Sequence, residues 1–177
     1  MPIINYMIAT KPLNQELQKT VIPSDYCVSD TNFDLNYYRL SADKRIIFGG
    51  GVSYSLKHSE VLAKKTEKRM LKVFPNLHNE KAEYIWGGYV GITLNRVPDI
   101  GQSSRRIYYA HGFSGHGVAL TGIAGRVIAN SIYSDAKGVL ETFEKINHRN
   151  FPGGRLFKMP LLVIISTLQR MTDIFNA

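Results

Sequence analysis

The sequence predicts an α+β protein, a mainly antiparallel sheet with flanking helices. Three observations predict this class. Two apolar, strand-like runs flank a turn-forming stretch in the pattern of a hairpin, strand-like segments fill the first part of the chain, and helical patterns dominate after residue 117. The 177 residues, 44% of them hydrophobic and 20% charged, are enough for a single domain over residues 1–177 with an apolar core.

The strands are expected along the first two thirds of the chain. The hairpin is the clearest element: its two runs are Leu35–Leu40 and Arg45–Phe48, and the turn between them is 41–44. Asp43 and Arg45 are expected to pair at this turn. Further extended segments are expected at Tyr6–Leu13, Ser24–Thr31, Ala82–Leu94 and Ile107–Ala110.

The helices are expected from the spacing of apolar side chains. The segment Ser59–Phe74 places its apolar residues on one side of a helix and Lys64, Lys65, Lys68 and Lys72 on the other. A row of lysines in this pattern indicates the solvated face of an amphipathic helix. Further helices are expected at Val118–Tyr133, Gly138–Asn147 and Met159–Phe175.

Composition and charge argue against several classes of function. The net charge of +8 would suit nucleic-acid binding, but the sequence carries no recognition motif for nucleic acid. The single cysteine, Cys27, allows no internal disulfide, and the five histidines lack the spacing of a zinc site. The apolar run Met159–Leu168 is about half of the roughly 20 residues that a bilayer span needs. Without a signal-sequence pattern, a cytoplasmic protein with no metal and no membrane span is expected.

A glycine-rich stretch lies between the last expected strand and the helix that follows it. It reads Gly112-Phe113-Ser114-Gly115-His116-Gly117. Glycines let another molecule approach the backbone, and the first turn of a helix offers N–H groups and partial positive charge. Such a turn suits a phosphate, a carboxylate or the electron-rich edge of a cofactor ring. The alternative is a tight connection that uses glycine only for its positive φ. The spacing is neither G-x-G-x-x-G nor G-x-x-x-x-G-K-[ST], so no site for the ADP part of a cofactor is predicted.

Five stretches of the sequence, taken in order, carry a family resemblance. They are IATKPL, YYRLSADKRIIFGGG, WGGYVGITLNRVPDIG, YYAHGFSGHGVALTGIAGRVIA and FPGGRLF. From Tyr6 to about Lys158 the chain resembles the C-terminal part of FAD-dependent oxidoreductases of the D-amino acid oxidase, glycine oxidase and sarcosine oxidase group. The closest likeness is to the γ-glutamylputrescine oxidase branch. The GFSGHG and WGG…T…PDIG elements are specific in combination, whereas either alone would not be.

The resemblance implies a fold, a cofactor and a set of site residues. Residues 1–104 would form the sheet and helix of the substrate domain, and residues 105–177 a strand, a flavin-side loop and the C-terminal helices. The backbone N–H groups of the loop would face the N1–C2 carbonyl edge of the isoalloxazine ring, where negative charge grows on reduction. The residues expected to bind the cofactor are Gly112, Phe113, Ser114, Gly115, His116, Gly117 and Val118. The residues expected to line the substrate pocket are Tyr38, Trp86 and Thr93. No catalytic acid or base is assigned, because a hydride can leave a neutral amine without one.

Two departures from the family pattern bear on the substrate and the cofactor. Amino-acid oxidases of this group clamp the substrate carboxylate with an arginine where Thr93 stands, and sarcosine oxidases use a lysine where Ala119 stands. Without these partners, an amine is the expected substrate rather than an α-amino acid. Sarcosine oxidases also tether FAD through a cysteine near the position of Gly88, and Cys27 is far from it in sequence. Non-covalent FAD is therefore expected.

The third departure is that the dinucleotide-binding half of the family is absent from the sequence. Two hypotheses remain open. In the first, the chain is the C-terminal part of an FAD-dependent enzyme that oxidises an amine C–N bond to an imine. Either a separate N-terminal FAD-binding chain completes it, or the chain is a truncated gene product. In the second, it is a non-catalytic remnant that folds and self-associates as a homo-oligomer. In either case the isolated chain is not expected to retain FAD.

Overall fold

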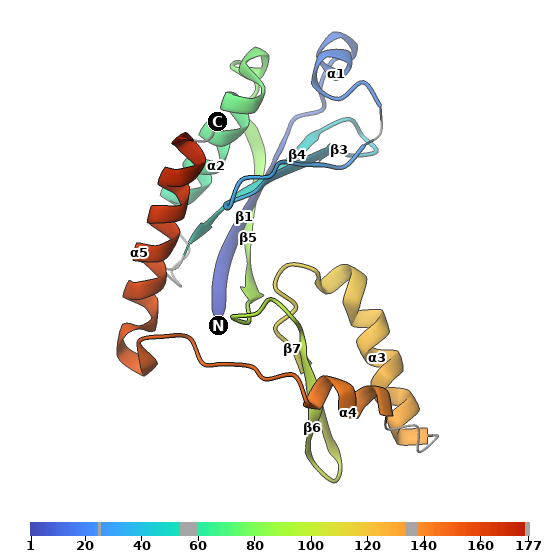
Figure 1. The fold of residues 1–177 in the computed structure, drawn as a ribbon. Helices are drawn as coiled ribbons and strands as arrows, with labels where there is room; N and C mark the ends of the chain where they lie inside the picture. Colours follow the sequence, from blue (N-terminus) through green and yellow to red (C-terminus); the bar gives the residue numbers. More distant parts are fainter. Residues whose placement is uncertain (25, 54–59, 134–137, 176–177) are drawn as a thin grey trace. The chain divides into compact units, whose positions relative to one another are not determined.

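The computed structural model describes residues 1–24, 26–53, 60–133 and 138–175. Both the α+β class and the antiparallel sheet pairing are confirmed (Figure 1). The elements are β1 (Pro2–Thr10), α1 (Gln15–Val21), β2 (Val28–Ser29), β3 (Asn36–Leu40), β4 (Ile46–Ser53), α2 (Glu60–Val73), the 3-10 helix η1 (Pro75–Leu77), β5 (Ala82–Gly91), β6 (Asp99–Ser104), β7 (Ile107–His111), α3 (Gly117–Tyr133), α4 (Gly138–Glu144) and α5 (Gly154–Phe175).

The contacts within the chain group it into two compact units. The unit of Ile4–Tyr89 and Pro160–Ala177 is called the sheet unit below, and the unit of Met1–Ile3 and Val90–Met159 is called the hairpin unit. The division passes through β5 and α5, and Pro160 lies inside α5 at the boundary. The expected segments 1–104 and 105–177 divide the chain by family role rather than by contacts, and they stay a prediction.

The sheet unit contains a five-stranded sheet in the order β2-β3-β4-β1-β5. The predicted hairpin forms its centre: β3 and β4 pair antiparallel, with Tyr38 opposite Phe48 and Leu40 opposite Ile46. β4 pairs antiparallel with β1 on its other side, so Phe48 also lies opposite Ile8. Because successive side chains of a strand point to opposite faces, this register places Ile8, Tyr38 and Phe48 on one face.

The helix α2 covers that face and closes the main core. Met70 and Leu77 are fully buried against the strands, together with Phe48 and Ile46. Thr66 Oγ1 donates a hydrogen bond to the carbonyl oxygen of Gly50 at 3.3 Å, which joins α2 to β4. The predicted basic amphipathic helix is thus confirmed over Glu60–Val73, with its lysines exposed. Ser59, its expected first residue, lies outside the described residues.

The hairpin turn is closed by side chains as well as by the backbone. The N–H of Lys44 donates to the carbonyl oxygen of Ser41 at 3.0 Å, and Ser41 Oγ donates to Asp43 Oδ1 at 2.6 Å. Arg45 Nε lies 2.6 Å from Asp43 Oδ2, which confirms the expected pair, and Arg45 also binds the carboxylate of Glu83 on β5. Hydrogen bonds from Ser41 and Arg45 lower the pKa of the Asp43 carboxyl below its ordinary value.

We expect Asp43→Asn to destabilise the protein in a pH-dependent way. The folded-state pKa of Asp43 is lowered, so its ionised form contributes stability above the unfolded pKa of about 3.9. That contribution is lost as the pH falls through the folded value. Urea unfolding of the two proteins should therefore differ at pH 7 and converge towards pH 3. A difference that is the same at both pH values would contradict this role of the carboxylate.

The hairpin unit is built on β6 and β7. These strands pair antiparallel from Asp99 opposite His111 to Ser104 opposite Ile107. The helices α3 and α4 supply Ala124 and Leu140 to a small core around Ile100, with Phe113 packed at its margin. Figure 1 shows α3 following the short loop after β7. The sequence pattern predicts β7 and α3 but does not predict β6.

Candidate functional site

The predicted strand–loop–helix junction is confirmed between β7 and α3. β7 ends at His111 and α3 begins at Gly117. Three loop residues adopt positive φ: Gly112 at 71°, Ser114 at 53° and Gly115 at 98°. Residues with side chains rarely adopt this region, so Ser114 needs local hydrogen bonds to hold it there.

Ser114 is held by both its backbone and its hydroxyl group. Its N–H donates to the carbonyl oxygen of Gly91 at 2.9 Å, and its Oγ donates to the carbonyl oxygen of Gly112 at 3.1 Å. The same Oγ accepts the N–H of Thr93 at 3.3 Å. These bonds fasten the loop to the segment that follows β5. These bonds therefore give the loop a defined conformation.

Two glycines of the loop differ in the space around them. A Cβ on Gly112 would lie 2.5 Å from Cγ2 of Thr93, so the inner side of the loop is fully packed. A Cβ on Gly115 would meet no atom of this chain within 4 Å. A Cβ on Gly117 would have Cβ of Phe113 as its nearest atom, at 3.8 Å. The backbone φ of Gly117 is not positive. Packing explains Gly112, whereas nothing within the described structure requires a glycine at 117.

The start of α3 faces solvent. The carbonyl oxygen of His116 accepts the N–H of Leu120 at 3.1 Å, and the N–H of His116 donates to the carbonyl oxygen of Phe113 at 2.9 Å. His116 thus occupies the cap of the helix. The N–H groups of the first turn have no partner within a helix and carry the positive end of its dipole. Val118, in this turn, is fully exposed at 103% of its reference area. A flat, electron-rich ligand edge could approach these N–H groups closely.

A titratable cluster lies at the base of the loop. Asp99 Oδ2 lies 3.5 Å from His111 Nε2, and Asp99 Oδ1 lies 3.9 Å from His148 Nε2. The ring of Tyr109 stacks on that of His111 with centroids 5.5 Å apart. Desolvation, and then the carboxylates of Asp99 and Glu144, raise the pKa of the Tyr109 phenol. This cluster was not predicted from the sequence, although Asp99 stands in the PDIG motif that carries the family resemblance.

Of the three predicted substrate residues, one belongs to the same unit as the loop. Thr93 lies in the hairpin unit, where its Oγ1 donates to the carbonyl oxygen of Val97 at 2.8 Å and lies 3.4 Å from Ser114 Oγ. Tyr38 and Trp86 belong to the sheet unit.

Tyr38 and Trp86 have different surroundings. The Tyr38 ring stacks on Phe48 at 5.6 Å and meets Phe74 edge-on at 4.9 Å, so its contacts are those of a core residue. Trp86 is 45% exposed on β5, and a Cβ on the nearby Gly88 would meet no atom within 4 Å. Trp86 is the more exposed of these two side chains, and the substrate role of both stays a prediction.

No group of three or more histidine, cysteine, aspartate or glutamate side chains in the described ranges could hold a metal ion. Within those same ranges, no helix has both the length and the apolar character needed to cross a bilayer.

Comparison with known proteins identifies the family. The chain is 38% identical over 173 residues to a γ-glutamylputrescine oxidoreductase of Escherichia coli, and it is 45% identical over 158 residues to a probable oxidoreductase, OrdL, of Haemophilus influenzae. These matches cover 98% and 89% of this chain but 40% and 36% of the relatives, so the chain spans well under half of their length. A glycine oxidase structure from Bacillus cereus shares the fold, with a TM-score of 0.65 at 15% identity over 84% of this chain and 39% of the other. Residues 1–131 match the family described as DAO, FAD dependent oxidoreductase. The chain therefore belongs to the DAO family of FAD-dependent oxidoreductases.

Proposed function

We propose that this chain is the C-terminal, flavin-facing part of an FAD-dependent oxidoreductase that oxidises an amine C–N bond to an imine. The observation that carries the proposal is the open glycine loop at the start of α3. Gly115 and Gly117 leave space on the outer side of the loop, and the helix start aims N–H groups and partial positive charge into that space.

The surroundings of Gly115 and Gly117 fit the ring edge of a flavin. Bound non-covalently, FAD would accept the hydride of the substrate. The task of this chain would be electrostatic: the N–H groups of Gly117, Val118 and Ala119 would stabilise negative charge at the N1–C2 carbonyl edge of the ring. Because Ser114 and Thr93 already fix the loop, this stabilisation needs little rearrangement. A side chain on Gly117 would project towards the ring and hold it away.

The surroundings of Thr93 favour an amine substrate. Its hydroxyl donates to a backbone carbonyl of its own segment, and its methyl group would contact any Cβ at Gly112. Thr93 thus packs against the loop and helps to hold it in place. It cannot replace a guanidinium that binds a carboxylate with two hydrogen bonds. This supports an amine without an adjacent carboxylate, a class to which the name of the Escherichia coli relative also points.

The exposed apolar surface of α3 supports an assembly. Val118, Ile123, Ile132 and Tyr133 are all more than half exposed on this one helix. Since the chain spans 36–40% of its two relatives, we propose that an FAD-binding half equivalent to their remaining residues covers this surface. The isolated chain is expected to cover it instead by self-association, as a homo-oligomer.

A chimera tests the proposed function. The 40% of the Escherichia coli relative that matches this chain is replaced by the chain. The purified chimera should contain FAD, and an amine such as γ-glutamylputrescine, added without oxygen, should bleach the visible absorbance of the oxidised flavin. A folded, FAD-loaded chimera that no amine reduces would overturn the proposal.

In the same chimera, Gly117→Ala should weaken FAD binding without weakening the fold. The chain has room for the new methyl group, so the free energy of unfolding of the isolated chain should change by less than about 1 kcal/mol. The FAD affinity of the chimera should fall by about tenfold or more, because the ring is held off its N–H donors. FAD binding is followed by flavin fluorescence. Unchanged affinity would show that the ring does not approach Gly117.

The isolated chain should not bind FAD tightly. The predicted loop contacts only the ring, and losing two hydrogen bonds to the pyrophosphate would weaken binding by about 100-fold or more. Titrating FAD into the purified chain should give no saturable change in flavin fluorescence below micromolar concentration. Saturable sub-micromolar binding would contradict the expectation that the cofactor needs the other half.

A further inference from the structure

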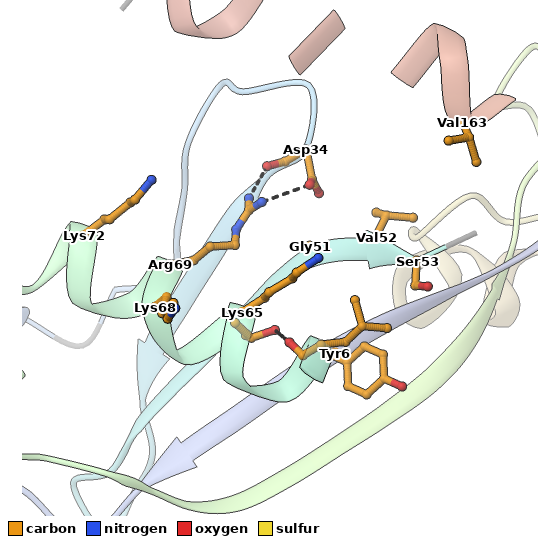
Figure 2. A pocket seen from close by; sticks show the side chains of 12 residues that line it. Tyr6, Asp34, Gly51, Val52, Ser53, Lys65, Lys68, Arg69, Lys72 and Val163 are labelled. Atoms are coloured by element: carbon orange, nitrogen blue, oxygen red, sulfur yellow. Dashed lines mark hydrogen bonds and ion pairs between the residues drawn. The ribbon is translucent and has the colours of Figure 1, made fainter. Parts of the chain in front are cut away.

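A pocket of about 500 Å³ lies within the sheet unit and shares no residue with the glycine loop. Its walls come from α2, β4, β1 and the part of α5 that belongs to this unit (Figure 2). The volume is in the range of pockets that enclose small molecules. The two kinds of wall, one cationic and one apolar, define what the pocket can bind.

The cationic wall is a row of three lysines on α2. Lys65, Lys68 and Lys72 follow one another along one side of the helix, and all three are exposed (Figure 2). Within the described part of the chain, none of them forms an ion pair with a carboxylate. Their charges are therefore available to an anion in the pocket.

A fourth cation, Arg69, has a structural task in the same wall. Its Nη1 lies 2.9 Å from Asp34 Oδ2, its Nη2 donates to the carbonyl oxygen of Asp34, and its Nε donates to Asn36 Oδ1 at 2.8 Å. Asp34 is buried, and Figure 2 shows its side chain joined to Arg69. This network neutralises Arg69 and fixes the end of the pocket, so the lysines carry its net positive charge.

The apolar wall comprises Tyr6 of β1, Val52 of β4 and Val163 of α5, with Leu62 of α2 beside the lysines. Ser53 and Thr66 also line the pocket. Val163 is only partly covered, although valine side chains usually lie inside proteins. A ligand that carried only charge would leave this wall exposed to water, whereas an organic body would cover it.

We propose that this pocket binds a small organic phosphate, an anionic phosphate group attached to a compact apolar body. The phosphate group lies against Lys65, Lys68 and Lys72, and the body lies against Val52 and Val163. Lysine binds phosphate as a point charge, and the three positive charges of the row more than balance the two negative charges of a phosphate monoester. This site is independent of the flavin loop and of the proposed oxidation.

The test is calorimetric titration of the purified chain with phenyl phosphate, inorganic phosphate and benzylamine. Phenyl phosphate should bind at one site per chain, at least about fivefold more tightly than inorganic phosphate, and benzylamine should not bind. We expect each single substitution of Lys65→Ala, Lys68→Ala and Lys72→Ala to lower the affinity for phenyl phosphate by about fivefold. The triple variant should lower it by about 100-fold. Val163→Thr should lower the affinity for phenyl phosphate but leave the affinity for inorganic phosphate unchanged.

Lys64→Ala is the matched control, because Lys64 is exposed on the same helix but does not line the pocket. Its affinity for phenyl phosphate should equal that of the wild type. Equal weakening by Lys64→Ala and Lys65→Ala would overturn the proposal, as would the absence of saturable binding. Tighter binding of duplex DNA that depends equally on Lys64 would also overturn it, since the row would then be a general polyanion surface.

Discussion

Replacing Gly112 by alanine is expected to lower the free energy of unfolding by about 2–4 kcal/mol. Two costs add at this position. The backbone φ of 71° is unfavourable for a residue with a side chain, and the new methyl group would lie 2.5 Å from Cγ2 of Thr93. The new methyl group and Cγ2 of Thr93 cannot move apart easily, because the hydrogen bond between Thr93 and Ser114 holds the loop in place. Urea unfolding of the purified variant measures the effect.

Two further variants separate the costs at Gly112. Gly115→Ala has the same kind of backbone strain, with φ at 98°, but open space around the methyl group, so it should cost only about 1–2 kcal/mol. Thr93→Ser removes the clashing methyl group while keeping the hydroxyl that donates to Val97. Combined with Gly112→Ala, it should restore part of the lost stability. Strictly additive effects of the two substitutions would show that the clash is absent.

Phe48→Ala should produce the largest loss of stability, about 3–5 kcal/mol. The side chain is 0% exposed, and it lies in the central strand β4 between Ile8 and Tyr38 of the neighbouring strands. Its ring stacks on Tyr38, which in turn packs edge-on against Phe74. Removing it opens a cavity in the cluster of buried residues that joins the sheet to α2.

The matched control for Phe48 is Phe157→Ala, which removes the same atoms from a side chain that is 67% exposed. It should change the free energy of unfolding by less than about 0.5 kcal/mol. Both variants are compared by urea denaturation monitored by circular dichroism. Similar losses in the two proteins would mean that the sheet core is not where the stability of the fold resides.

Elements with a strong local pattern were predictable from the sequence. The hairpin of β3 and β4 combines two apolar runs with a turn whose side chains bond within four residues, from Ser41 to Arg45. The helix α2 repeats its apolar residues at the helical period over four turns. The glycine loop is placed correctly because a strand pattern ends and a helix pattern begins on either side of it. In each case the interactions that define the element lie close together in sequence.

The missed elements lack such a pattern. The strand β6 reads DIGQSS, with one apolar side chain, and it is a strand because β7 pairs with it. The helix α1 has only seven residues; its signal is the cap, where Asn14 accepts the N–H of Leu17 at 2.9 Å. A polar strand and a short helix gain their stability from neighbouring elements rather than from their own sequence.

By itself, the sequence determined the fold class, the family, the hairpin, the amphipathic helix and the glycine loop, because these depend on period, turn chemistry and motif order. Only the tertiary structure decided what each side chain contacts. It placed Tyr38 against the core and Thr93 against Gly112, gathered His111 and His148 around Asp99, and set the lysines of α2 beside an apolar wall. These contacts include pairs from 10 to about 100 positions apart, and no local pattern encodes a distance between segments that meet only when the chain folds.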